Sequence, residues 1–159
     1  MTTPSSPAHA GVRYPPPLLY LAGLAAGWLL NSWRPLPITA GVSSARVVGA
    51  TFCVVIYLVI FGSAFSAFRR ARTTLIPNRP AAALVTIGPY RITRNPMYVS
   101  LVSLYLGVAL LANSWWPMIL LPVVILLVDR LIIAREERYL ATAFPEEYGA
   151  YRLRVRRWL

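Results

Sequence analysis

The stretch Gly88-Pro89-Tyr90-Arg91-Ile92-Thr93-Arg94-Asn95-Pro96-Met97-Tyr98 joins a long arginine-rich connection to the apolar run Val99-Ser100-Leu101-Val102. Its two prolines, two arginines and two tyrosines are too polar for a helix buried in an apolar core. One pair of apolar segments precedes it and another pair follows it. A polar stretch between such segments is expected at a membrane surface. We therefore predict that it carries the functional site and that the rest of the chain holds it in place.

The composition indicates a membrane protein. Hydrophobic residues make up 57% of the chain and charged residues 13%, whereas soluble domains carry about 25% charged residues. The 159 residues suffice for one compact domain, and four apolar runs approach the roughly 20 residues that a helix needs to cross a bilayer. The predicted fold class is an all-α integral membrane bundle of about four transmembrane helices.

The predicted organisation is a flexible tail over residues 1–14 and a single membrane domain over residues 15–159. The predicted spans cover residues 15–33, 46–68, 97–112 and 115–134, with a site-bearing loop at 69–96 and a cytoplasmic C-terminal helix at 135–159. A tight turn at Asn113 and Ser114 makes the last two spans a helical hairpin, and Pro122 should kink the fourth span. A cleaved signal peptide is not expected, because the first apolar run ends in Trp33-Arg34 rather than in small residues.

The net charge is +11, and all 16 positively charged side chains are arginines, since the chain has no lysine. The arginines stand at the ends of apolar runs rather than along one polar face, so we predict a membrane topology and no nucleic-acid partner. If the 69–96 loop is cytoplasmic, 14 of the 16 arginines lie on that side and only Arg34 and Arg46 lie outside. The positive-inside rule then places both termini in the cytoplasm.

Several chemistries are excluded by the residue inventory. The chain has one histidine, His9, and one cysteine, Cys53, so no metal site is predicted. It also lacks a glycine-rich phosphate loop and a serine nucleophile motif. A reaction that depends on positioning more than on acid–base chemistry fits best.

All five acids fall within residues 129–147. The hairpin should bring Glu136 and Glu137 beside the Gly88–Tyr98 stretch, where an unpaired charge near the bilayer boundary would be costly. We therefore expect these two to be paired, and we expect Glu146 and Glu147 to be solvated surface residues. For Asp129, pairing with loop groups and extension towards the interface stay equally open.

The pair Asn95-Pro96 fits a helix start, because asparagine is a preferred N-cap and proline suits the first helical position. A helix N-terminus also attracts anionic ligand groups. Arg91 and Arg94 would add a clamp for a carboxylate or a phosphate. Tyr98, at the edge of the motif, is expected to pack and is a functional candidate.

Two motifs recur in a known order and separation: Leu84-Val85-Thr86-Ile87-Gly88-Pro89-Tyr90-Arg91 with Arg94-Asn95-Pro96-Met97-Tyr98, and Arg135-Glu136-Glu137-Arg138-Tyr139-Leu140 with Phe144, Glu147-Tyr148 and Tyr151. Together they resemble the isoprenylcysteine carboxyl methyltransferase and phospholipid methyltransferase superfamily, over roughly residues 70–157. Where that superfamily usually has Arg-His-Pro, this chain has Asn95 in place of the histidine.

The resemblance implies a bacterial-type membrane methyltransferase, in the inner (plasma) membrane, that binds S-adenosylmethionine between the last hairpin and its cytoplasmic extensions. A lipophilic acceptor, either a prenylcysteine-like carboxylate or a phospholipid amine, would enter from the bilayer. The cofactor-binding residues it implies are Gly88, Tyr90, Arg94, Asn95, Pro96, Tyr98, Glu136, Glu137 and Tyr148, and the catalytic residues are Arg91 and Glu136.

Two other functions stay open. One is a reductase resembling the membrane sterol reductases, with a nicotinamide cofactor, although four spans leave little room for a dinucleotide. The other is a non-catalytic membrane protein whose basic face binds anionic lipid. Gly23 and Gly27 place small residues on one helix face, which favours packing inside the bundle and also permits a homodimer.

Overall fold

The computed structural model describes residues 15–71 and 83–159. The elements, in chain order, are α1 (Pro17–Trp33), α2 (Ser44–Arg70), the 3-10 helix η1 (Gly88–Arg91), α3 (Pro96–Leu111), α4 (Trp115–Val128), the π-helix η2 (Asp129–Ile133), α5 (Ala134–Ala143) and α6 (Pro145–Arg154). Within these two ranges no strand forms, and the predicted all-helical class is confirmed. The predicted tail and part of the predicted loop lie outside the described residues.

Local sequence explains where the helices begin. Pro96 and Pro145 occupy the first positions of α3 and α6, where the missing N–H costs nothing and the fixed φ suits a helix. Ser114 caps α4 by accepting a hydrogen bond from the Trp116 N–H. Asn113 has a φ of +51°, so the predicted turn between the last two spans is present.

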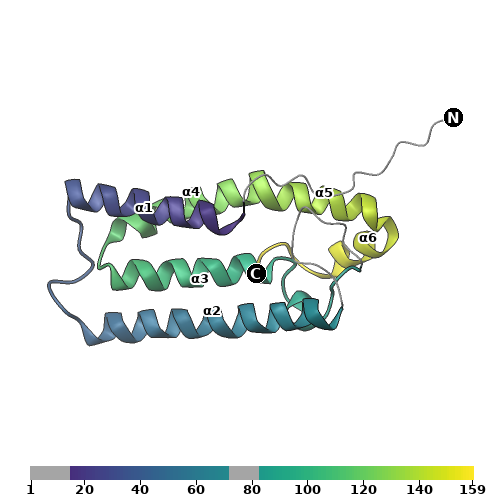
Figure 1. Ribbon diagram of the computed structural model, residues 1–159, viewed down its shortest axis with the longest axis horizontal. Coiled ribbons are helices and arrows are strands. Elements are labelled where there is room, and N and C mark those ends of the chain that lie inside the picture. Colours follow the sequence, from purple (N-terminus) through teal and green to yellow (C-terminus); the bar gives the residue numbers. More distant parts are fainter. Residues whose placement is uncertain (1–14, 72–82) are drawn as a thin grey trace.

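The four long helices form a bundle in which α1 packs on α4, α4 on α3, and α3 on α2 (Figure 1). Buried tyrosines connect the layers by hydrogen bonds to backbone carbonyls. The Tyr105 hydroxyl donates to Pro117 O at 2.9 Å, and the Tyr20 hydroxyl donates to Tyr98 O at 3.2 Å. These bonds satisfy polar groups that would otherwise be unpaired in the core.

The small-residue face of α1 lies against α4. Both glycines are buried. A Cβ at Gly23 would come within 2.4 Å of Val124, and one at Gly27 within 2.8 Å of Pro117. The prediction that this face packs within the bundle is confirmed. Because α4 covers this face, it is not available to a second copy of the chain in this structure, and the homodimer stays a prediction.

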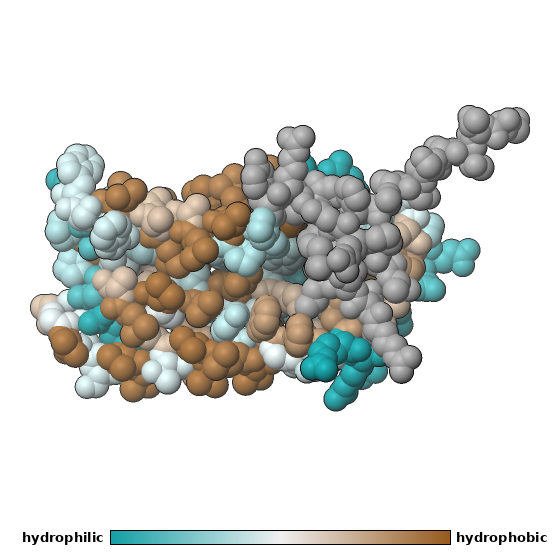
Figure 2. All heavy atoms as spheres, viewed as in Figure 1, coloured by the Kyte–Doolittle hydropathy of each residue, from teal (hydrophilic) through white to brown (hydrophobic). Residues whose placement is uncertain are grey.

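Two helical stretches are long and apolar enough to cross a membrane: α2, and the continuous run Trp115–Ala143 formed by α4, η2 and α5. The apolar helix α3 is shorter, and α1 has 17 residues. Hydrophobic residues cover much of the sides of the helices, with hydrophilic residues gathered at the ends (Figure 2). Four membrane spans, and their orientation, stay predictions.

The C-terminal region differs from the single helix predicted over 135–159. The helix breaks at Phe144, with φ −135° and ψ 65°, and Pro145 starts a new helix. Proline cannot continue a helix, because it lacks the N–H and restricts the residue before it. After α6 the backbone becomes extended at Val155 and Arg156 forms a β-bridge with Thr93.

The fourth span continues without a break into the segment that carries the acids. Pro122 lies inside α4, and the predicted kink there stays untested. Between α4 and α5 the sequence Asp129–Ile133 adopts a π-helix, which sequence analysis did not foresee. Such π segments are rare and occur frequently at functional sites.

Candidate functional site

One end of the bundle brings together η1, the start of α3, and helices α5 and α6 (Figure 1). Tyr151 of α6 donates a 2.7 Å hydrogen bond to Tyr90 O in η1. Tyr98 of α3 reaches Glu136 of α5. The two sequence motifs therefore meet in space, as predicted.

Glu137 is the charged centre of this region. It is only 8% exposed, and Arg94 and Arg157 both form ion pairs with it. The Arg94 pair has 3.1 Å between Nη1 and Oε1, and each of the two side chains is 11% exposed. A carboxylate buried to this degree needs such partners. The expectation that Glu137 is paired with the loop is confirmed.

This cluster retains unused hydrogen-bonding capacity. Arg94 Nε and Glu137 Oε1 are buried and find no hydrogen-bond partner among the described residues. The Arg94–Glu137 contact is close, but its geometry is not that of a hydrogen bond. Buried polar atoms without partners are uncommon in proteins. Arg94 Nε and Glu137 Oε1 thus each keep hydrogen-bonding capacity, which a ligand with both an anionic and a cationic group would satisfy.

Tyr98 and Glu136 form a second contact next to this cluster. The Tyr98 hydroxyl lies 2.9 Å from each oxygen of the Glu136 carboxylate and donates to it. Tyr98 itself is 7% exposed. The Tyr98 phenol therefore fixes the orientation of the Glu136 carboxylate on α5.

Tyr148 joins the cluster from α6. Its hydroxyl accepts a 3.3 Å hydrogen bond from Arg94 Nη1. Burial raises the pKa of Tyr148 to about 12, so the phenol stays protonated at neutral pH. The nearby Glu137 carboxylate also raises this pKa.

Asn95 stands at the predicted N-cap position of α3, but its side chain does not cap the helix. Instead Asn95 Nδ2 donates a 2.9 Å hydrogen bond to Arg157 O. The capping interpretation of this side chain is wrong, because the amide is oriented by its Nδ2 bond to the C-terminal segment and its oxygen accepts no hydrogen bond from an N–H of α3. Pro96 starts α3 as predicted and is buried directly behind Asn95.

The residues of η1 lie at the edge of the site. Gly88 has a φ of +62°, a conformation that glycine adopts without strain. Tyr90 is buried edge-to-face against Phe68 of α2, with ring centroids 5.6 Å apart. Arg91 is exposed, and no hydrogen bond or ion pair between described residues joins it to Glu136 or Glu137. The structure thus does not bring Arg91 together with the acids.

Two participants, Arg157 and Trp158, were not predicted from the sequence. Arg157 pairs with Asp129 at 3.2 Å as well as with Glu137, and Trp158 Nε1 donates to Asp129 at 3.1 Å. Asp129 therefore pairs with the C-terminal segment, and no described residue of the loop pairs with it. Arg157 gave no distinguishing signal, because a basic run at a membrane protein's end is already explained by topology. Of the acids assigned to the surface, Glu146 and Glu147 are exposed.

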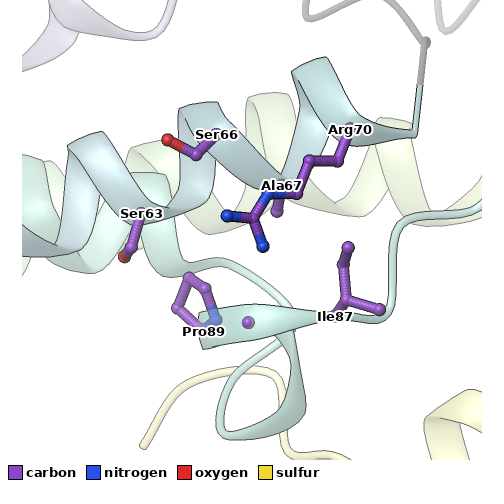
Figure 3. Close-up of a pocket in the computed structure, with 7 residues that line it drawn as sticks. Ser63, Ser66, Ala67, Arg70, Ile87 and Pro89 are labelled. Atoms are coloured by element: carbon purple, nitrogen blue, oxygen red, sulfur yellow. The ribbon is translucent and has the colours of Figure 1, made fainter.

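A groove of about 370 Å³ lies beside this region, between the end of α2 and η1. It is lined by Ser63, Ser66, Ala67, Arg70, Ile87, Gly88 and Pro89 (Figure 3). Figure 3 shows the Arg70 guanidinium lying over the space between α2 and Pro89. The exposed apolar face of α2, which includes Phe52, Leu58 and Val59, leads along the helix towards it. None of the acids lines this groove.

These features define an all-helical protein with membrane-length apolar helices and a buried arginine–carboxylate cluster at one end. The chain belongs to the phospholipid methyltransferase family, whose model matches residues 45–147. The matched range contains α2, η1, α3, α4 and α5 and ends before Arg157. Membership implies a membrane methyltransferase, and the predicted superfamily is confirmed. The family match supports neither the reductase nor the non-catalytic alternative.

Two curated proteins are similar to parts of the chain. An uncharacterized protein of Haemophilus influenzae is 44% identical over 66 residues, which is 40% of this chain and 100% of that protein. The cobalt-zinc-cadmium resistance protein CzcN of Cupriavidus metallidurans is 37% identical over 71 residues, which is 45% of this chain and 33% of that protein. The chain thus matches only a third of CzcN. No solved structure is significantly similar to it.

Proposed function

We propose that this protein is an S-adenosylmethionine-dependent methyltransferase that acts on a lipophilic acceptor at the cytoplasmic face of a bacterial inner membrane. The observation that supports it most is that two buried atoms of the Arg94–Glu137 ion pair, Glu137 Oε1 and Arg94 Nε, have no hydrogen-bond partner among the described residues. The methionine portion of this cofactor carries an ammonium and a carboxylate, which match that pair in charge and hydrogen-bonding sense.

When bound, the cofactor supplies an electrophilic methyl group on a sulfonium. The residues around the cofactor hold it and orient it. Glu137 accepts hydrogen bonds from the ammonium or from ribose hydroxyls, Arg94 with the start of α3 at Asn95 and Pro96 binds the carboxylate, and Tyr148 donates its hydroxyl. Tyr98 and Tyr90 supply aromatic surface, and Glu136, whose carboxylate is held by Tyr98, is the catalytic carboxylate.

Such a site accelerates methyl transfer mainly through alignment. Holding two reactants in line and excluding water can contribute about 7 to 11 kcal/mol. The apolar face of α2 and the groove at its end support entry of the acceptor from the bilayer. The positive charges of Arg70 and Arg91 suit a phosphate or carboxylate on that acceptor.

Calorimetric titration tests the cofactor class. Detergent-purified protein is titrated with S-adenosylmethionine, with S-adenosylhomocysteine and with a reduced nicotinamide dinucleotide. We expect saturable binding of the first two only. Glu137→Gln should lower their affinity by about tenfold or more, the effect of losing one charged hydrogen bond. Glu147→Gln, which removes the same charge from the exposed face of α6, should leave it unchanged.

Two other results would contradict the proposal. Binding of the dinucleotide alone would move the protein to the reductases, and binding of none of the three would reject a methyltransferase. The acceptor is then sought by transfer of a labelled methyl group to vesicles that contain phosphatidylethanolamine or to a farnesylated N-acetylcysteine. We expect labelling of one of these two acceptors and none when both are omitted.

A further inference from the structure

The segment after α6, residues 155–159, lies across the candidate site and is called the strap below. Arg94 N donates to Arg156 O at 2.8 Å. Thr93 Oγ1 and Asn95 Nδ2 both donate to Arg157 O, at 3.0 and 2.9 Å. The backbone of the strap is thus bonded to the polar stretch just before α3, and these bonds place the Arg157 side chain over the acids.

The Arg157 guanidinium connects the two acids that face it. Nη1 lies 3.2 Å from Asp129 Oδ2, and Nη2 binds Glu137 Oε2. The hydrogen bond with Glu137, and the charges of both acids, raise the pKa of Arg157. Arginine suits this place because its nitrogens are held apart in one rigid plane, whereas lysine offers a single nitrogen.

The two oxygens of the Glu137 carboxylate have different partners. Oε2 accepts a hydrogen bond from Arg157, while Oε1 lies 3.1 Å from Arg94 Nη1 in an ion pair and accepts no hydrogen bond from the described residues. Arg157 is also the more exposed partner, with 36% of its side chain accessible against 11% for Glu137. The arginine therefore fixes one carboxylate oxygen from the outside and leaves the other available to the interior of the cluster.

We propose that Arg157 is a positioning residue for the cofactor site: it holds Glu137 by Oε2 so that Oε1 is presented to the ligand. This inference rests on the proposed function, because the ligand is the cofactor named there. Without Arg157, the Glu137 carboxylate is no longer held by Oε2 and can rotate, so that Oε1 leaves the place it has in the structure. Cofactor binding then has to reverse this rearrangement, which weakens the affinity.

The test compares four variants by calorimetric titration with S-adenosylhomocysteine and by thermal unfolding in the same detergent. Arg157→Gln should weaken binding by about tenfold, the effect of one charged hydrogen bond. Arg157→Lys, which keeps a cation near Glu137, should recover part of that loss. Arg156→Gln removes the same charge from an exposed neighbouring side chain and should change the affinity by less than about twofold.

Trp158→Phe separates positioning from simple attachment of the strap. It removes the indole donor to Asp129 and leaves the Arg157–Glu137 contact in place. The thermal midpoint should fall while cofactor affinity stays close to that of the natural protein. If Trp158→Phe weakens binding as much as Arg157→Gln, Arg157 only holds the strap and the inference is overturned.

Binding by Arg157→Gln and by the natural protein separates this inference from the proposed function. Normal binding by Arg157→Gln overturns the inference and leaves the proposed function intact, whereas failure of the natural protein to bind overturns both. If Arg157→Gln does not fold, Arg157→Lys carries the test: a measurable loss of affinity at an unchanged thermal midpoint supports positioning, and unchanged affinity rejects it.

Discussion

Tyr98 shows how single residues connect the two motifs of the chain. Its hydroxyl donates to Glu136 in α5, and its carbonyl accepts a hydrogen bond from Tyr20 in α1. Sequence analysis singled out Tyr98 as a functional candidate from its place at the motif's edge. The contact with Glu136 depends on the hairpin geometry that brings α3 and α5 together.

Tyr98→Phe should lower the free energy of unfolding by about 1 to 3 kcal/mol, because it leaves the Glu136 carboxylate without its phenol donor. Reversible unfolding in mixed detergent micelles measures this. Tyr57→Phe, on α2 and half-buried, is the matched control and should change stability by less than about 0.5 kcal/mol. Equal effects of both substitutions would show that the Tyr98 hydroxyl contributes nothing.

The residues of the candidate site differ in how easily their contacts could be predicted from the sequence. Arg94 and Glu137 could be predicted to pair, because both stand at the ends of predicted spans that a tight turn places side by side. Arg91 was predicted to join Arg94 in a clamp for an anionic ligand group, and η1 leaves it exposed. The part of Arg157 in the cluster depends on a break at Phe144 and on an extended chain end, neither of which a periodic pattern predicts.

At the scale of elements, α1 is fitted to α4 by its two glycines. A Cβ at Gly27 would stand 2.9 Å from Pro117 N, which is backbone and cannot move aside. We expect Gly27→Ala to destabilise the protein by about 1 to 3 kcal/mol, the usual cost of overpacking.

Gly62→Ala provides the comparison for that substitution. Gly62 is exposed inside α2, and an added Cβ there would meet no atom within 4 Å. Its stability should be unchanged or raised by up to about 1 kcal/mol, since alanine is the better helix former. Unfolding of both variants in the same micelles checks the pair. A stable Gly27→Ala protein would mean that α1 and α4 are not in this contact.

At the scale of the whole molecule, the helices turn back on one another so that the end of α2, the start of α3 and helices α5 and α6 lie towards the same end of the bundle (Figure 1). Arg34 and Arg46 stand near the opposite end, in or beside the connection from α1 to α2. This arrangement agrees with the uneven distribution of arginines along the sequence. The orientation in the membrane follows from the positive-inside rule and is a prediction.

Reporter fusions test the orientation. A fluorescent protein that folds only in the cytoplasm should be bright when fused after Leu159, and a phosphatase active only outside the cytoplasm should be active when fused after Ala40. The exchanged fusions at the same positions serve as controls and should be inactive. The opposite pattern at both positions would invert the predicted topology.

The sequence by itself determined the all-helical class, the approximate bounds of the long helices, and the convergence of the Gly88–Tyr98 stretch with Glu136 and Glu137. These follow from local patterns: apolar run length, proline and glycine at helix ends, and a turn of two residues. Only the tertiary structure decided that Gly23 and Gly27 face α4, that Asn95 bonds to the chain end rather than capping α3, and that Arg157 joins Asp129 to Glu137. Each of these depends on contacts between residues more than 15 positions apart, which no local pattern specifies.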